Sequence, residues 1–191
     1  NFGNTGCITF IGIEFINVRL SSKNSNCEDA INIINSRGKI KYIDIKDSIS
    51  DGLDIDFSQI SIDKVFISNS KNDCADFSMG KYNINEIITE YCGDKSISVG
   101  ENSIFIAKKV YSKFSDIGLA TKDSSYSAVD FIDIQKTKYC IAAYNKKQEF
   151  TGGKIEVNQI NCTDYSEEKF LDNISIYEAK KGNLKSSLKI L

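Results

Sequence analysis

The feature that most constrains the fold is a repeat of about 22 residues that recurs through most of the chain. Segments such as GLDIDF and SISVG alternate apolar and polar residues, and each directly follows a column of mainly small residues. An alternation with a period of two is typical of a strand with one buried face. A repeat of this length indicates a solenoid in which each repeat forms one coil. The column consists of Ile8, Ala30, Gly52, Cys74, Ser96, Gly118, Cys140 and Cys162.

Two strand regions recur within each repeat, and stacking them would bury continuous ladders of aliphatic residues. In the first region the inward positions are Ile31, Ile33, Leu53, Ile55, Ala75, Phe77, Ile97, Val99, Leu119 and Ile141. In the second region the main columns are Ile40, Ile62, Ile84 and Ile106, and Ile43, Val65 and Ile87. We therefore predict an all-β fold, a right-handed parallel β-helix of about seven coils. A leucine-rich repeat is excluded because its L-x-x-L-x-L-x-x-N frame is absent.

The six cysteines fall into three consecutive pairs, and each pair is separated by about one coil. Stacked residues lie roughly 4.8 Å apart, which is within the Cα separation that a disulfide tolerates. We predict the bridges Cys7–Cys27, Cys74–Cys92 and Cys140–Cys162, with the last pair in one column of adjacent coils. The alternative is that all six are buried small apolar residues. Disulfides would place the protein in an oxidising compartment, secreted or on the cell surface.

Composition excludes several classes of function. The chain has no His, which rules out Ser-His-Asp and Cys-His catalysis and any His-ligated zinc site. A net charge of −2 is unfavourable for binding nucleic acid. No apolar run is long enough for a membrane span. The chain does not begin with Met and shows no signal peptide, so we expect a mature product or a fragment of a longer protein.

Acidic and lysine side chains are predicted to gather on the outward face of the first strand region. One outward column is Asn32, Asp54, Asp76, Ser98, Ala120 and Ala142, and its neighbour is Ile34, Asp56, Ser78, Gly100, Lys122 and Tyr144. A third column at the corner contains Asp29, Asp51, Asp73 and Lys95.

Three interpretations of this face are open. Stacked carboxylates repel one another, so they should raise each other's pKa, bind a cation or pair with lysine. Asp54, Asp56 and Asp76 could hold calcium, which prefers clustered oxygen ligands. Paired carboxylates or a lysine could also act as the acid and base of a glycoside hydrolase or polysaccharide lyase. The simplest alternative is a solvated face that keeps the solenoid soluble.

Several strings resemble those of bacterial right-handed β-helix repeat domains of the pectate-lyase-like superfamily, some of which accompany spore-coat CotH-like modules. They are SDGLDIDFS, KNDCADFSMG, CGDKSISVGE, GLATKDSS and AAYNKKQEFTGG, and the resemblance covers roughly residues 6–165. It implies an exported β-helix and says little about activity.

A more distant resemblance is to polygalacturonases, whose motifs read NTDG, DDC, GHG and RIK on successive coils. Asp51, Asp73 and Lys122 match the first acid, one acid of the pair and the final lysine. Asn72, Lys95 and Ala120 replace the other acid, the histidine and the arginine. If the chain is an enzyme, the resemblance implies Asp51, Asp73, Lys95 and Lys122 as catalytic residues. The losses imply an ancestral site that no longer hydrolyses pectin.

Residues 139–153 depart from the repeat and carry Tyr144, Lys146 and Phe150. We expect a longer loop there, suited either to sugar or protein contact or to an ordinary turn. We assign residues 1–164 to the β-helix and residues 165–191 to a segment that caps its open end. The N-terminal end has no obvious cap, so a preceding domain or end-to-end self-association would supply one.

The leading hypothesis from sequence is an extracellular, non-catalytic β-helix that displays a carbohydrate-binding or adhesive face. Its partner would be a polysaccharide or cell-surface glycan, without nucleic acid and without a cofactor other than calcium. Alternatives are a lyase or glycoside hydrolase acting on pectin-like acidic glycans, and a structural coat or appendage subunit. The expected binding residues are Asp54, Asp56, Asp76, Tyr144 and Lys146.

Overall fold

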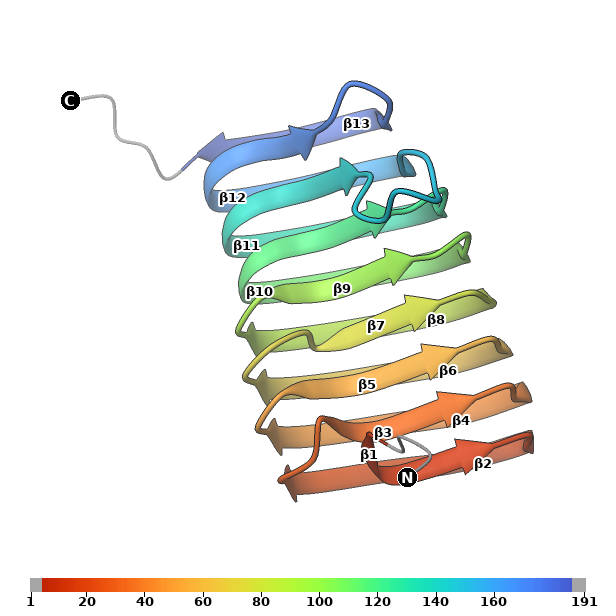
Figure 1. Ribbon diagram of the computed structural model, residues 1–191. Coiled ribbons are helices and arrows are strands. Elements are labelled where there is room, and N and C mark those ends of the chain that lie inside the picture. Colours follow the sequence, from red (N-terminus) through yellow and green to blue (C-terminus); the bar gives the residue numbers. More distant parts are fainter. Residues whose placement is uncertain (1–4, 187–191) are drawn as a thin grey trace.

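The computed structural model describes residues 5–186, and in this range the chain forms a parallel β-solenoid. It has about eight turns of about 22 residues, one more turn than the sequence predicted. Figure 1 shows the coils stacked one above another, each with a strand in front and a strand behind. Within the described range no helix is long and apolar enough to span a membrane.

Short and long strands alternate along the first part of the chain. The short strands are β1 (Gly6–Ile11), β3 (Asp29–Ile34), β5 (Asp51–Asp56), β7 (Ala75–Ser78) and β9 (Lys95–Gly100). The long strands are β2 (Glu14–Ser25), β4 (Arg37–Ser48), β6 (Gln59–Ser70) and β8 (Lys81–Cys92). Further on, the two kinds join into continuous strands, which are β10 (Ile104–Lys122), β11 (Tyr126–Tyr144) and β12 (Lys154–Leu171). The final strand, β13 (Ile176–Ser186), corresponds to a long strand alone.

Every strand pairs in parallel with the equivalent strand of the next coil. Across the short strands Leu53 pairs with Ala75 and Ala75 with Ile97, so that each partner lies one turn further along the chain. This register places the alternating apolar residues of the repeat on the inside, as predicted. The outward residues of successive coils therefore also stack in columns.

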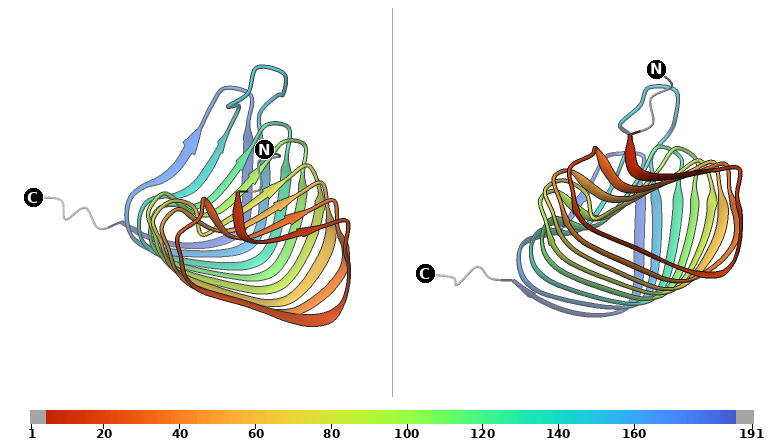
Figure 2. Two further views of the ribbon diagram at one scale, coloured as in Figure 1. Left: turned by 60° about the horizontal axis from the view of Figure 1, so that its bottom comes forward. Right: turned by 90° about the horizontal axis from the view of Figure 1, so that it is seen from below.

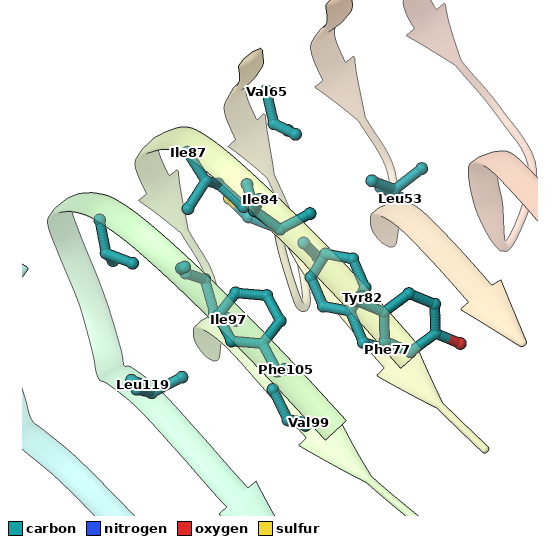
Figure 3. Close-up of a cluster of buried hydrophobic side chains, with 14 of the residues drawn as sticks. Leu53, Val65, Phe77, Tyr82, Ile84, Ile87, Ile97, Val99, Phe105 and Leu119 are labelled. Atoms are coloured by element: carbon teal, nitrogen blue, oxygen red, sulfur yellow. The ribbon is translucent and has the colours of Figure 1, made fainter. Parts of the chain in front are cut away.

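The interior is a ladder of aliphatic residues with a small aromatic group near its middle. Phe77 contacts both Tyr82 and Phe105, with ring centroids 5.0 and 5.1 Å apart, and Figure 3 shows these rings among the aliphatic side chains. The single hydroxyl proton of Tyr82 is shared between the carbonyl oxygens of Ile55 and Ser78, so this buried polar group is satisfied. The inward positions predicted for the first strand region are all buried.

The corners of each coil require residues in the left-handed backbone region. One row of such residues follows the short strands, and its members Asn35, Phe57, Met79, Glu101 and Asp123 all have positive φ. Buried serines then close the corners. For example, the hydroxyl of Ser58 accepts a hydrogen bond from the backbone N–H of Ser36 and donates one to the carbonyl of Asp56. These corners explain many of the serines in the sequence.

The repeat length changes at three places, and the sequence predictions fail there. Ile106 was expected in the inward column of Ile84, but Ala107 pairs with Ile84 and the side chain of Ile106 is 38% exposed. One extra residue in the turn before β10 shifts the register, and a shift of one residue exchanges the two faces of a strand. Ile8 similarly pairs with Ile31, one position away from the predicted column.

The third change is the loop of residues 145–153, which we call the β11–β12 loop. It lengthens one coil, so that Tyr126 pairs with Lys154 and not with Gln148, where the regular repeat would place its partner. Figure 2 shows that this loop projects from the outline of the stacked coils. Cys162 therefore pairs with Ile134 and does not stack on Cys140, contrary to the prediction.

The segment expected to cap the C-terminal end continues the solenoid. The predicted boundary at residue 164 falls inside β12, and β13 then pairs in parallel with β12 as a further coil. Most side chains of β13 are exposed, because among the described residues no further strand pairs with it. The outer ends of the two predicted ranges, residues 1–4 and 187–191, lie outside the described residues.

All three predicted disulfides are present. Their Cα atoms are 5.3 Å apart for Cys7–Cys27, 5.4 Å for Cys74–Cys92 and 6.3 Å for Cys140–Cys162. Three disulfides are compatible with an extracellular protein.

The Cys140–Cys162 bridge links the start of a short strand to the long strand that follows it in the chain. Two coils earlier, Ser96 and Ser112 occupy the equivalent positions, and their hydroxyls form a hydrogen bond there. The disulfide therefore crosses the interior within one turn and does not join stacked residues.

Candidate functional site

Outward side chains of the short strands form one polar face across the middle of the solenoid. We call it the acid–lysine face, made up of Asp29, Asp51, Asp54, Asp56, Asp73, Asp76, Lys95 and Lys122. The predicted outward column is confirmed by the register, since Asn32 pairs with Asp54, Asp54 with Asp76 and Asp76 with Ser98. Six carboxyl groups and two ammonium groups therefore lie on adjacent coils.

The acids at the corner are fixed by the backbone of the next coil. Oδ1 of Asp51 accepts a hydrogen bond of 2.9 Å from the backbone N–H of Asp73. Oδ1 of Asp73 accepts one of the same length from the backbone N–H of Lys95. Asn72 also donates to Asp51 through its side-chain amide. These two predicted catalytic acids thus form a ladder that supports the corner of the solenoid.

Lys95 lies next to these acids and is buried. Its ammonium group contacts Asp94 and lies 3.4 Å from Oδ1 of Asp73. Burial alone would lower the pKa of Lys95, but Asp73 and Asp94 together raise it above its usual value. Lys95 therefore stays protonated at neutral pH, which disfavours the general-base role expected of a lyase.

Lys122 extends across two coils. A Cβ at Gly100 would lie 2.9 Å from the Cε of Lys122, so the lysine side chain lies directly over this glycine. Its ammonium group comes within 3.8 Å of Oδ2 of Asp76. The predicted pair Lys95 and Lys122 is therefore split between different acids, Asp73 and Asp76.

Among the carboxyl groups of this face, Asp54 has the most strongly raised pKa, and the pKa of its neighbour Asp56 is raised as well. Burial, followed by the charge of Asp56, raises the pKa of Asp54 to about 9. Burial and Asp76 raise the pKa of Asp56 to about 6, although a hydrogen bond from Asp54 acts in the opposite direction. At neutral pH the pair therefore retains a proton, which the hydrogen bond holds between the two carboxyl groups.

The pKa values of two acids at the corner, Asp51 and Asp29, are also raised. Burial, and then the charge of Asp73, raises the pKa of Asp51 to about 6. The pKa of Asp29 is raised by burial, with further contributions from Glu28 and Asp76. Among the described residues, no lysine or arginine forms an ion pair with Asp29 or Asp51, whereas Asp73 has Lys95.

Four buried polar atoms on this face have no hydrogen-bonding partner among the described residues. They are Oδ2 of Asp29, Oδ1 of Asn32, Oδ1 of Asp76 and Oγ of Ser98. Asn32 is only 1% exposed, and its Nδ2 donates to Oδ2 of Asp54 at 2.8 Å, so its free oxygen lies beside the acids. Buried polar atoms are almost always paired in folded proteins. Five similar atoms lie elsewhere among the described residues, and all nine are almost inaccessible to solvent, so they do not by themselves mark a ligand site.

An aromatic cluster borders the same face toward the C-terminal end. The ring of Phe170 lies 5.8 Å from that of Tyr139 and 5.7 Å from that of Tyr144, measured between centroids. Phe170 pairs with Ala142 and so continues the outward column of Asp54 and Asp76. Burial raises the pKa of Tyr144, and the nearby charge of Lys95 acts in the opposite direction.

Sequence reasoning found Tyr144 but missed Phe170 and Tyr139. Phe170 fell in the segment assigned to a cap, because the regular step of the repeat was continued unchanged past residue 145. That step would lead from Ala142 to Asp164, whereas the lengthened coil pairs Ala142 with Phe170. The departure of residues 139–153 from the repeat was the signal that the register had to be restarted.

The β11–β12 loop is held firmly against the solenoid. Oδ1 of Asp123 accepts hydrogen bonds from the backbone N–H groups of Lys146 and Lys147, at 2.7 and 2.8 Å. The ammonium group of Lys147 forms an ion pair with Glu101, two coils below. Lys146, predicted to bind ligand, is on this loop, and among the described residues its side chain forms no ion pair with the acid–lysine face.

The calcium site expected at Asp54, Asp56 and Asp76 remains a prediction. Within residues 5–186, no group of three or more acidic or cysteine side chains is arranged to hold a metal ion. Their oxygen atoms are nevertheless of the type that calcium prefers. A binding experiment with and without calcium tests this prediction.

Comparison of the chain with protein-family models, with curated proteins and with solved structures found no match. The β-solenoid is thus established by the structure of the chain itself. The pectate-lyase-like and CotH-associated relationships remain expectations from the sequence.

Proposed function

We propose that this chain is an extracellular saccharide-binding domain, and that a glycan lies along the acid–lysine face toward the aromatic cluster. The observation that carries the proposal is the position of Phe170, Tyr139 and Tyr144 at one end of a face rich in hydrogen-bonding groups. Sugars present hydroxyl groups at their edges and C–H groups on their ring faces. A site for them combines polar side chains with aromatic rings.

The partly exposed carboxyl groups of the face support the polar half of this proposal. Asp54, Asp56 and Asp76 each present carboxyl oxygen atoms that can accept hydrogen bonds from hydroxyl groups. Because six carboxyls outnumber two lysines, the face favours neutral or amino sugars over the acidic glycans that the pectinase resemblance implied.

A screen on a glycan array, with and without calcium, tests the proposal. We expect the wild type to bind neutral or amino-sugar glycans. Asp54→Asn and Phe170→Ala should each weaken binding about tenfold or more, which corresponds to ~1.4 kcal/mol. Asp63→Asn is a matched control, since Asp63 is an exposed acid of β6 that pairs with Lys39 away from the face. Equal binding by all four proteins, or no binding by any of them, would refute the proposal.

A hydrolase is the second candidate, and the Asp54–Asp56 pair favours it. Glycosidases use a protonated carboxyl as acid and an ionised carboxylate as base or nucleophile, and different environments hold the two pKa values apart. The pKa values of Asp54 and Asp56 are raised to different extents, to about 9 and about 6, as in that pattern. The hydrogen bond between the two carboxyl groups places them closer together than the roughly 5–9.5 Å that separates glycosidase pairs, so a substrate would have to part them. Release of reducing ends from the array glycans, abolished in Asp54→Asn, would make this chain an enzyme.

A further inference from the structure

A separate pocket opens beside the acid–lysine face, at the corner that follows the short strands. It has a volume of about 370 Å³, and its lining includes Phe57, Met79, Glu101 and Phe150. Phe57 and Met79 come from adjacent coils, whereas Phe150 comes from the β11–β12 loop. The volume is near the lower end of the range for ligand pockets, roughly 300–1,000 Å³, and suits one sugar ring better than a larger ligand.

Phe57 and Met79, the two apolar residues at this corner, have an unfavourable backbone conformation and remain exposed to solvent. Phe57 has a φ of 51° and Met79 a φ of 49°, so both lie in the left-handed region. Bulky side chains are unfavourable there, whereas Asn is well tolerated and occupies the same row at Asn35. The side chain of Phe57 is also 57% exposed, so burial does not offset the backbone cost. A role in binding would account for both features.

The opposite wall of the pocket is fixed before any ligand arrives. The side-chain amide of Asn145 donates to the carbonyl oxygens of Lys147 and Phe150, at 3.0 and 2.7 Å. Asp123 and Glu101 anchor the same loop from the coils. Phe150 is therefore held in place, and binding does not require the loop to be ordered.

Two residues of the pocket directly follow residues of an outward column on the acid–lysine side. Phe57 directly follows Asp56 in the chain, and Met79 directly follows Ser78 of the same outward column. The carboxylate of Glu101, which lines the pocket, also acts electrostatically on Asp56. A ligand on the face would reach the pocket by extending one unit past Asp56.

We propose that this pocket is a second sugar subsite, in which Phe57 and Phe150 contact the apolar face of a ring in the same glycan chain. The inference rests on the proposed function, because the neighbouring unit must lie on the acid–lysine face. Glu101 and the polar residues at the rim would meet the hydroxyl groups of that ring, and the aromatic and thioether groups its C–H surface.

Calorimetric titration with oligosaccharides tests the inference. The probes are cello-, manno- and chito-oligosaccharides of two to six units. The variant is Phe57→Asn, which restores the residue type found at Asn35. The control is Tyr91→Asn. Tyr91 lies at the other corner of the coil, is exposed to a similar extent (55%), and also has a positive φ, of 56°. Asn69 shows that the control corner also accepts this residue.

We expect Phe57→Asn to weaken binding of the longer probes about tenfold and to leave the shortest unchanged, while Tyr91→Asn binds as wild type. Phe150→Ala should act in the same way as Phe57→Asn. If the wild type binds, Asp54→Asn weakens binding and both Phe variants match wild type at every length, the subsite is refuted and the proposed function stands. If the wild type binds no probe, the proposed function and the subsite both fail.

Discussion

At the scale of single residues, Asp54 shows that the acidic groups of this face oppose folding when they are ionised. Its carboxyl lies between Asn32 and Asp76 on adjacent coils, and its pKa of about 9 reflects burial and the neighbouring Asp56. An apolar or amide side chain would avoid this cost. A residue that opposes folding is often retained for a function.

The acids of this face should make the protein less stable as the pH rises. In the unfolded chain their carboxyls titrate near 4, whereas in the folded protein Asp51 and Asp56 titrate at about 6 and Asp54 at about 9. The folded state therefore binds more protons between these values, and stability falls as pH rises through this window. We expect the melting temperature at pH 5 to exceed that at pH 8 by about 3–10 °C, or ~1–3 kcal/mol.

Thermal melts of wild type and Asp54→Asn at pH 5 and pH 8 test this expectation. The amide cannot ionise, so the variant should melt higher than wild type at pH 8 and show a smaller difference between the two conditions. The range stops at pH 5 because Asp172 and Glu156 have lowered pKa values and lose their stabilising interactions in more acidic solution. A wild type that melts at the same or a lower temperature at pH 5 contradicts the account.

At the scale of elements, the repeat predicts the strands wherever the coil length is constant. Alternation over a fixed period identifies which residues of β3, β5, β7 and β9 point inward, because each such strand has one buried face. The insertions before β10 and in the β11–β12 loop leave the alternation intact but change its phase. The phase cannot be recovered from periodicity alone, so Ile106 and Cys162 were misplaced while the strands that contain them were expected.

The Cys140–Cys162 bridge should contribute strongly to stability because it fastens a lengthened coil. Replacing both residues by Ser gives the pair found at the equivalent positions Ser96 and Ser112, whose hydroxyl groups are hydrogen-bonded to each other. We expect the double variant Cys140→Ser, Cys162→Ser to lose about 2–4 kcal/mol of unfolding free energy, measured by chemical denaturation.

Comparison with the double variant Cys7→Ser, Cys27→Ser separates two effects of a disulfide on stability. One is the loss of chain entropy in the unfolded state, and the other depends on where in the solenoid the bridge lies. The two bridges join residues at similar separations in the sequence, so a purely entropic effect would make the losses nearly equal. We expect a smaller loss at Cys7–Cys27, since most side chains of β1 and β2 are exposed, whereas β11 and β12, which Cys140–Cys162 joins, bury many of theirs. An unchanged stability in the Cys140 and Cys162 variant would show that this bridge does not hold the coil.

At the scale of the whole molecule, the sequence predicted the architecture and the outward columns of the candidate site, but not the contacts between those columns. Outward columns follow from the repeat, so the stacking of Asp54 on Asp76 was predictable. The contacts that cross columns were not, because they depend on side-chain length and on small neighbours such as Gly100 beneath Lys122. The aromatic end of the face, with Phe170, depended on a register that the loop changes.

The most direct test of the account is to locate a bound glycan on the solenoid. Backbone amide chemical shifts would be recorded by NMR while the strongest ligand from the array is added. We predict that the perturbed amides cluster on the outward side of β5, β7 and β9, around Tyr144 and Phe170, and in the β11–β12 loop. Perturbations confined to the opposite side of the coils, on β6 and β8, would contradict the assignment of the acid–lysine face as the binding site.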